Sequence, residues 1–313
     1  MNKIRMMLAA SLFAGMMFVL GGCGLERTTY LYQNSEKYIA GDRDISDRID
    51  AVDIDYFAGD VSLVASDTGV VSVRETAKVE LDDAKKVHTW VDGSTLRVRY
   101  CASGKHMDLN NLDKDLVITM PKNVDLRSLE SKMSAGDLTI TDITAVDAKL
   151  HSSAGDITAA LDSQECDIKT SAGSVALKSA KESGNISIDV SAGNIAVDVA
   201  SARYLKLHAS SGDVEVRADS LHDLISDTSS GDGEYYFKSA PAAASIHSSS
   251  GSVKVFLPKE PDITADIRTS AGKLFYDIPF IQKDGNYVSG SGQNKLDIDV
   301  SAGNIEIRDI DAQ

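Results

Sequence analysis

Apolar and polar residues alternate with a period of two along most of the chain, and a short Ser-Ala-Gly or Ser-Ser-Gly segment interrupts the alternation at regular intervals. The glycines of these segments are residues 136, 155, 173, 193, 212, 231, 251, 272 and 303, with gaps of 18 to 21 residues and a last gap of 31. Such alternation predicts β-strands with one buried face. A fixed period near twenty residues predicts stacked structural repeats.

The residue pattern within each repeat predicts a strand, a tight turn and a second strand. In the fourth copy, Ile195 and Val197 follow the turn glycine Gly193 at every second position, and Ile186 and Ile188 precede it in the same way. A glycine readily adopts the positive φ that a tight turn needs, and a Ser, Asp or Asn next to it can bond the turn backbone. The repeated unit is therefore a two-strand rung.

The position four residues before each glycine indicates how the rungs stack. It reads Lys132, His151, Lys169, Asp189, His208, Asp227, His247, Arg268 and, after an insertion, Asp299. From Lys169 to His247 the charge alternates in sign if histidine counts as positive. Neighbouring turns of a β-solenoid lie about 4.8 Å apart, so opposite charges in such a column would pair. We therefore predict an all-β fold, a β-solenoid of about nine two-strand rungs built from roughly 19–20-residue repeats.

The first 23 residues have the pattern of a secretory signal. Lys3 and Arg5 precede an apolar run from Met6 to Leu20, which leads into Gly21-Gly22-Cys23. The run is too short for a stable membrane span and has small residues at its end. The Leu-Gly-Gly-Cys ending resembles the bacterial lipobox, which implies cleavage before Cys23 and lipidation of its thiol, with palmitate among the acyl chains. The alternative is an ordinary signal followed by a structural cysteine.

The remaining chain divides by pattern. We expect a signal peptide at 1–22, a lipidated cysteine and polar tether at 23–44, and a single β-repeat domain at 45–313. Within that domain, 45–120 is a degenerate N-terminal part that would cap the solenoid, and 121–313 holds the regular repeats. Residues 278–295 form an insertion, expected to be a loop or partial cap. The last copy, Leu296 to Ile307, is expected to close the stack.

The chain is acidic, which narrows its partners. Its formal net charge is −15, and loss of 1–22 would make it about −17 because Lys3 and Arg5 are removed with no acid. Such a surface argues against nucleic acid and against peripheral docking on anionic lipid. The expected contact with the membrane is therefore the lipid anchor, on the extracytoplasmic face of the cell membrane.

A family resemblance adds to this reading. The segment from Lys114 to Pro121, followed by Leu126, Leu129 and the run of Ser-Ala-Gly-Asp repeats, is similar to the bacterial putative-adhesin β-strand-repeat family, which includes LiaG-like proteins of the cell envelope. Phe57-Ala58-Gly59-Asp60-Val61 fits its opening. The resemblance covers roughly residues 50 to 310 and implies a β-repeat fold and a role in adhesion. It implies no catalytic residue.

Candidate sites each have a structural alternative. The pairs Asp137/Asp156 and Asp213/Asp232 could hold a weakly bound cation, although aspartates beside a turn glycine favour a turn role. The histidine-containing column could ligate zinc, but residues on one line favour a charge ladder. Cys101 and Cys166 are expected to face different surroundings, which disfavours a disulfide. We predict no metal, no cofactor and no enzymatic activity, because no nucleophile elbow, phosphate loop or ligand cluster occurs.

Aromatic residues gather in the last third of the chain. The alternation places Tyr236 and Phe256 outward on adjacent rungs, with Phe275 near the next. Exposed aromatic residues are typical of contact surfaces, so these three form the candidate partner surface. The alternative is that the insertion at 278–295 covers them.

Together these features predict a non-enzymatic, lipid-anchored, extracytoplasmic binding module of the bacterial cell envelope. Its partner would be an envelope protein or glycan, in adhesion or envelope-stress sensing. The alternative is a structural spacer or self-assembling rod without a specific ligand.

The anchor is tested by Cys23→Ser. We expect this variant to be released from membranes or to stay unprocessed, because the thiol that carries the lipid is gone. Fractionation of cells into membrane and soluble material, followed by immunoblotting, measures the outcome. Unaltered membrane association would refute lipidation at this residue.

Overall fold

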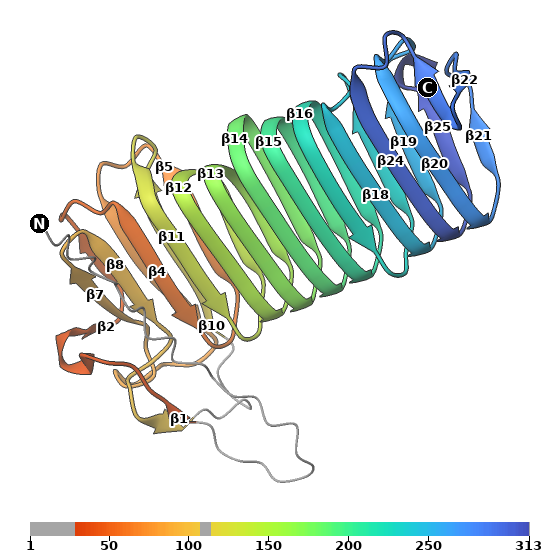
Figure 1. The fold of residues 1–313 in the computed structure, drawn as a ribbon. Coiled ribbons are helices and arrows are strands. Elements are labelled where there is room, and N and C mark those ends of the chain that lie inside the picture. Colours follow the sequence, from red (N-terminus) through yellow and green to blue (C-terminus); the bar gives the residue numbers. More distant parts are fainter. Residues whose placement is uncertain (1–28, 107–113, 313) are drawn as a thin grey trace, which may run out of the picture.

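The described part of the chain is all-β and rod-shaped (Figure 1). The computed structural model describes residues 29–106 and 114–312. Over these ranges the only helices are two short 3-10 turns, η1 (Ser35–Lys37) and η2 (Ile310–Ala312). None of the helices in the described ranges has the length and hydropathy to cross a membrane. The predicted fold class, a β-solenoid, is confirmed.

Five long strands form the middle of the rod, and each runs from one glycine turn to the next. They are β12 (Leu138–Ala154), β13 (Ile157–Ala172), β14 (Val175–Ala192), β15 (Ile195–Ser211) and β16 (Val214–Thr228). Each bends at a corner, so that its first half lies in one sheet and its second half in the other. We call these the post-turn sheet and the pre-turn sheet, by their position relative to the glycine.

The rungs toward the two ends use separate strands for the two sheets. In the post-turn sheet these are β5 (Val61–Ser66), β10 (Lys114–Pro121), β17 (Gly233–Phe237), β19 (Val253–Leu257), β21 (Leu274–Tyr276) and β25 (Ile305–Asp309). In the pre-turn sheet they are β4 (Ala51–Tyr56), β8 (Thr95–Arg99), β11 (Asp125–Met133), β18 (Ala243–Ser250), β20 (Ile263–Ala271) and β24 (Asn294–Ala302).

Neighbouring rungs pair in parallel and in register, so that one position of the repeat always faces the same position of the next. Ile168 pairs with Ile188, and Ile188 pairs with Leu207. All three side chains are buried between the two sheets in one continuous hydrophobic core. The period-two alternation therefore encodes inward and outward columns along the whole rod.

The turn glycines form a column in which each backbone lies against the next. A β-carbon placed on any of them would lie 1.8–2.2 Å from a carbonyl oxygen of the neighbouring rung. The stacked glycines are Gly59, Gly136, Gly155, Gly173, Gly193, Gly212, Gly231, Gly251, Gly303 and Gly272, in that spatial order. Ten turns fit the nine regular copies and the degenerate first copy that the sequence predicts.

The residue after each glycine ties one turn to the next. The N–H of Asp156 donates to the Asp137 carboxylate at 2.8 Å, and the N–H of Asp232 donates in the same way to Asp213. Asn194 and Ser174 continue the same ladder through their side-chain oxygens. These aspartates thus have the predicted turn role, although they bond the adjacent turn rather than their own.

The order of the rungs at the C-terminal end differs from the order of the sequence. β24 pairs with β18 on one side and β20 on the other, and β25 lies between β19 and β21 (Figure 1). The prediction that Leu296 to Ile307 closes the stack is therefore wrong. The chain first forms the outermost rung, β20–β21, and the insertion then returns it to a position between this rung and the rung β18–β19. The last copy is therefore paired with a neighbouring strand along both of its edges.

The N-terminal end has the same interleaved order. β4 lies between β8 and β11, and β5 lies between β10 and β12. The first copy in the sequence is thus the second rung in space. Beyond it, β6 (Val71–Ala77) and β7 (His88–Asp92) pair in antiparallel fashion with β10 and β8 and cap the stack, as predicted for part of 45–120.

A buried ion pair fixes the cap to the rod. Lys114 at the start of β10 is 2.7 Å from Glu75 of β6, and both side chains are almost fully buried. The Lys114 ammonium also donates to the Lys85 carbonyl at 2.6 Å and lies 4.0 Å from the centre of the Tyr100 ring. Burial lowers the pKa of Lys114, and the neighbouring Glu75 opposes this shift.

Within the residues that the structure describes, the expected tether is folded. β1 (Thr29–Tyr30) pairs with β9 (Lys105–His106), β2 (Ile39–Ala40) pairs with β7, and β3 (Arg43–Ile45) pairs with β6. The Tyr30 hydroxyl donates to the Asp55 carbonyl at 2.7 Å. The prediction of a tether is therefore wrong for residues 29–44, because Tyr30 and its neighbours bury apolar surface against the cap. Cys23 and residues 24–28 lie outside the described residues.

The insertion at 278–295 is a partial cap at the other end. It contains the hairpin β22 (Ile281–Lys283) and β23 (Asn286–Ser289), and β23 pairs with the outer edge of β20. Phe280 and Tyr287 pack on Tyr276 with ring centroids 5.5 and 5.6 Å away. The hairpin thus closes the core at this end.

The glycine column predicts a large cost for a single added methyl group. In Gly193→Ala the new β-carbon would lie 2.1 Å from the Gly173 carbonyl oxygen at a φ of 143°. We expect the free energy of unfolding to fall by at least about 3 kcal/mol. Urea unfolding followed by circular dichroism measures it. The exposed neighbour Ala196→Ser should cost less than about 0.5 kcal/mol, and equal costs would contradict the role of the close approach.

Candidate functional site

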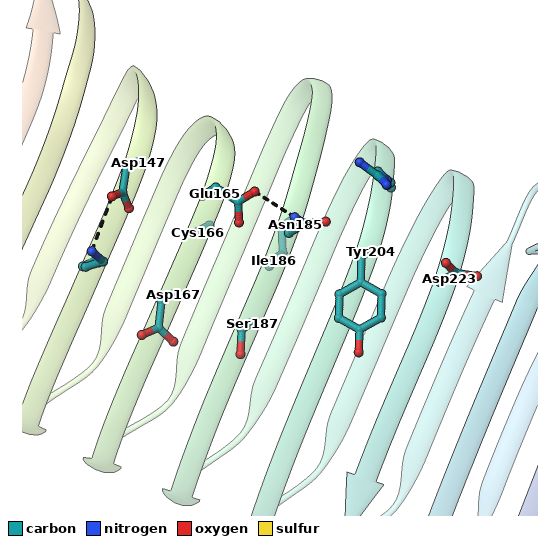
Figure 2. Close-up of a pocket in the computed structure, with 11 residues that line it drawn as sticks. Asp147, Glu165, Cys166, Asp167, Asn185, Ile186, Ser187, Tyr204 and Asp223 are labelled. Carbon is teal, nitrogen blue, oxygen red and sulfur yellow. Dashed lines mark hydrogen bonds and ion pairs between the residues drawn. The ribbon is translucent and has the colours of Figure 1, made fainter. Parts of the chain in front are cut away.

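A shallow groove of about 600 Å³ crosses the outer face of the pre-turn sheet in the middle of the rod (Figure 2). Its lining comes from five consecutive rungs, β12 to β16, and therefore from residues about twenty apart in the sequence. The lining residues are Asp147, Lys149, Glu165, Cys166, Asp167, Asn185, Ile186, Ser187, Arg203, Tyr204 and Asp223.

The groove results from a change of side-chain size along two adjacent outward columns. In one column Glu165 pairs with Asn185, and Asn185 pairs with Tyr204. In the other, Asp167 pairs with the small Ser187. The short side chains of the middle rung leave a depression between the acidic side chains on one side and the Tyr204 ring on the other (Figure 2).

Polar groups line the groove, and most of them face solvent. Asn185 donates to the Glu165 carboxylate at 2.7 Å, and Lys149 lies 3.4 Å from Asp147. Partial burial alone would raise the pKa of Asp167, but hydrogen bonding and charge from Lys169 and His151 outweigh it and lower that pKa. The Asp167 carboxylate is thus ionised at neutral pH, and the acidic side chains of the groove offer hydrogen-bond acceptors.

The two described cysteines are buried, and burial raises the pKa of both thiols. Burial raises the pKa of the Cys166 thiol to about 12 and that of Cys101 to about 11. Both are buried and free, and they lie in different rungs, Cys101 directly after β8 and Cys166 in β13. The sulfur of Cys166 faces the core under the groove, where it packs as a small apolar group.

The predicted aromatic surface is only partly assembled. Tyr236 and Phe256 are outward neighbours with ring centroids 4.4 Å apart and planes within 1° of parallel. The Arg217 guanidinium covers the other face of Tyr236 at 4.0 Å, and Phe256 is only 9% exposed. Phe275 is separated from them by the inserted strand β25, so the three do not form one patch. The insertion does not lie over this pair; its rings contact Tyr276.

The other candidates have structural roles. The aspartate pairs form the turn ladder described above, and in the described ranges no three His, Cys, Asp or Glu side chains come together as metal ligands would. The charged column exists, and its spatial order places Asp299 between His247 and Arg268. Arg268 lies 3.7 Å from Asp299. The sign alternation thus continues through the interleaved rungs.

A second, smaller pocket of about 240 Å³ lies at the N-terminal end, which sequence reasoning missed. Tyr38 packs edge-on to Trp90, and the Lys37 ammonium lies 4.7 Å from the Trp90 ring. Arg99 and Arg97 are both paired with Asp53, at 2.9 and 2.6 Å. The tyrosines of the expected tether were the available signal, because a solvated tether has no need for aromatic residues.

Comparison with protein families gives a match over most of the chain. The family model described as Toastrack DUF4097 matches residues 49–308, which run from just before β4 into β25 and include every rung of the rod. A search of curated proteins gives no significant match.

The comparison with solved structures finds matches from three bacterial species. A "putative adhesin" from Bacteroides fragilis is 14% identical, with 85% of this chain and 95% of that chain covered and a TM-score of 0.41. A "putative lipid binding protein" from Parabacteroides distasonis is 16% identical, with 87% and 96% covered and a TM-score of 0.35. A "putative cell adhesion protein" from Clostridium sporogenes is 11% identical, with 86% and 99% covered and a TM-score of 0.23.

Because both thiols are buried, they should react slowly with a disulfide reagent. In a Cys23→Ser chain at pH 8, we expect Cys101 and Cys166 to resist a disulfide reagent, because both are buried and the thiolate of Cys101 is on the order of one part in a thousand. Absorbance of the released thiol measures the reaction. The same chain in concentrated urea, as a control, should release two equivalents. Reaction within minutes in native buffer would contradict the assigned burial.

Proposed function

The chain belongs to the Toastrack DUF4097 family, and from this premise we propose that it is a lipid-anchored, extracytoplasmic binding module of the bacterial cell envelope without enzymatic activity. The partner is an envelope protein or glycan, and the module acts in adhesion or in sensing envelope stress. Its ligand site is the groove at Tyr204 on the pre-turn sheet.

The observation that carries this proposal is the groove itself. It combines an aromatic ring, Tyr204, with the amide of Asn185 and the hydroxyl of Ser187 on a rigid parallel sheet. Aromatic faces with polar groups around them are the usual elements of a recognition site. Because the strands are paired on both sides, the lining needs little ordering when a ligand binds.

The same geometry favours binding over catalysis. The groove is open to solvent, whereas catalytic groups act in sites that exclude water. The thiol nearest to it, Cys166, is protonated and faces the core. The acidic lining also favours neutral or cationic groups on the partner, and the chain's net charge of −15 acts in the same direction.

A lipid anchor at Cys23 would lie close in the chain to the N-terminal end of the rod. Cys23 precedes the first described residue, Thr29, by six residues. An extended segment of that length spans at most about 20 Å. A lipidated Cys23 would thus hold the N-terminal end of the rod near the membrane and direct the groove and the C-terminal end away from it.

The groove is tested by filling it. We expect Ser187→Arg to reduce recovery of the partner at least tenfold, because the long side chain would occupy the depression beside Tyr204 and reverse part of its charge. In-cell cross-linking of the anchored chain, purification and mass spectrometry measure the recovery. Tyr204→Ala should reduce it as well, through loss of the aromatic contact.

The matched control is Thr158→Arg, which adds the same side chain at an exposed position of the post-turn sheet. It should leave recovery unchanged. Equal recovery from Ser187→Arg, Tyr204→Ala and the parent chain would reject the groove as the ligand site. Recovery of no partner from the parent chain would favour the structural spacer.

A further inference from the structure

The two ends of the rod are protected differently. At the N-terminal end β7 and β2 continue the pre-turn sheet beyond β8, and β6 and β3 continue the post-turn sheet beyond β10. At the C-terminal end the hairpin β22–β23 adds a paired strand only to the pre-turn sheet, at Ile263 to Ala265 of β20, while Phe280 and Tyr287 contact the Tyr276 ring of β21 from the core side. Over the described ranges, β21 pairs with β25 and with no other strand. Its outer edge is therefore open.

The hydrogen bonds of β21 show which groups face that edge. The Lys273 carbonyl accepts from the Ile305 N–H, and the Asp277 N–H donates to the Ile307 carbonyl. Residues 273, 275 and 277 therefore direct their backbone groups toward β25. Because direction alternates along a strand, the N–H and C=O groups of Leu274 and Tyr276 point outward, away from the stack. An open edge of this kind is a template for another strand.

The sequence of this edge is complementary to itself in the antiparallel direction. It reads Lys273-Leu274-Phe275-Tyr276-Asp277. Pairing with an identical strand centred on Phe275 places Lys273 opposite Asp277 twice and Phe275 opposite Phe275. The same register places Leu274 opposite Tyr276, the residues whose backbone groups face outward, so that each pair can exchange two hydrogen bonds. Opposite charges and aromatic pairs are the favourable cross-strand combinations.

The side chains at this edge are available for contact. Phe275 is 42% exposed and Tyr276 is 43% exposed, which is unusual for aromatic residues beside a closed core. The Lys273 ammonium forms no ion pair over the described ranges, whereas Asp277 lies 3.6 Å from Arg308 and is still 41% exposed. The outward ring and the free cation are thus on the same face of the strand.

The hairpin does not obstruct such pairing. β23 pairs with the beginning of β20, at the end of the rung away from the glycine turn, whereas β21 begins two residues after Gly272. An antiparallel twofold arrangement reverses the strand direction. The hairpins of the two copies therefore lie on opposite sides of the axis, each beyond the turn edge of its partner.

We propose that a second copy of this chain docks at the C-terminal edge, β21 against β21 in antiparallel register centred on Phe275. The hydrogen-bonding direction of the sheets runs along the rod, so this dimer joins two rods tip to tip. Their N-terminal ends then point in opposite directions. If each N-terminus is held in a membrane through Cys23, as the proposed function has it, the dimer bridges two membranes that face each other.

The contact is small, because it involves one short strand from each copy, and it belongs with weak, reversible interfaces. The proposed dimer is tested by charge reversal at Lys273 and Asp277, which lie opposite each other in the proposed register. Lys273→Asp would place two carboxylates opposite each other at each cross-strand pair, and Asp277→Lys would place two ammonium groups there. We expect each variant alone to dimerise at least tenfold more weakly than the parent chain. Mixed one to one, the two variants should associate again, because cross-strand pairs of opposite charge are restored between them.

Sedimentation equilibrium of the full chain in detergent measures dimerisation independently of the anchor. Lys283→Asp is the matched control, because it reverses an exposed lysine on β22 at the same end and should change nothing. Circular dichroism melts verify that each variant is folded. A monomeric parent chain, or a dimer that neither reversal weakens, would overturn the proposal, as would a failure of the mixed variants to associate.

Bridging is measured with vesicles that carry the chain, by light scattering. Vesicles with Lys273→Asp should cluster with vesicles that carry Asp277→Lys, and neither kind should cluster alone. A chain that dimerises in detergent but does not stay on vesicles would reject the anchor and leave the edge contact intact. A chain that stays on vesicles without clustering them would reject tip-to-tip bridging.

Discussion

The close approach of each glycine turn to the next is the constraint on which the rest of the structure depends. No β-carbon fits at these positions, since it would lie within 2.2 Å of a neighbouring carbonyl oxygen. The approach allows the N–H of Gly173 to donate to the Ala192 carbonyl, so hydrogen bonding continues around the turn. The aspartate, serine or asparagine that follows adds a bond to the next turn. The pitch of the rod is thus uniform from end to end.

Because the pitch is uniform, equivalent positions of successive repeats line up in columns. The outward columns determine the charge and the shape of the surface. One column alternates in charge from Lys169 to Arg268, because like charges at about 4.8 Å would repel. Another changes from Glu165 through Asn185 to Tyr204, and this change of size makes the groove. A site on such a surface is a local departure from the regularity of its column.

The features that a single repeat determines could be predicted from the sequence. The spatial order of the repeats could not. Strands, turns and inward columns follow from alternation and from glycine, so they were predicted correctly. The interleaving of β24 between β18 and β20 was not predicted, since any copy can pair with any other through the same backbone groups. One signal was present: only with Asp299 between His247 and Arg268 does the alternation of charge that starts at Lys169 continue to Arg268. The groove was missed because its residues lie in five different copies. The fold of residues 29–44 was missed because the prediction of a tether followed their polar composition and took no account of their tyrosines.

The interleaved ends explain why the two tips differ from the middle. A terminal copy at the edge of a stack would have one free side and would open easily, since parallel rungs are held by their neighbours. Here the first and last copies are each paired on both sides, and the outermost rungs come from segments with chain on both ends. Fraying of a terminus therefore does not expose the core. The remaining edges must then be covered by added strands, as at β6 and β7, or stay open. β21 is the edge that stays open, and its self-complementary charges are the feature that distinguishes a contact surface from an unprotected end.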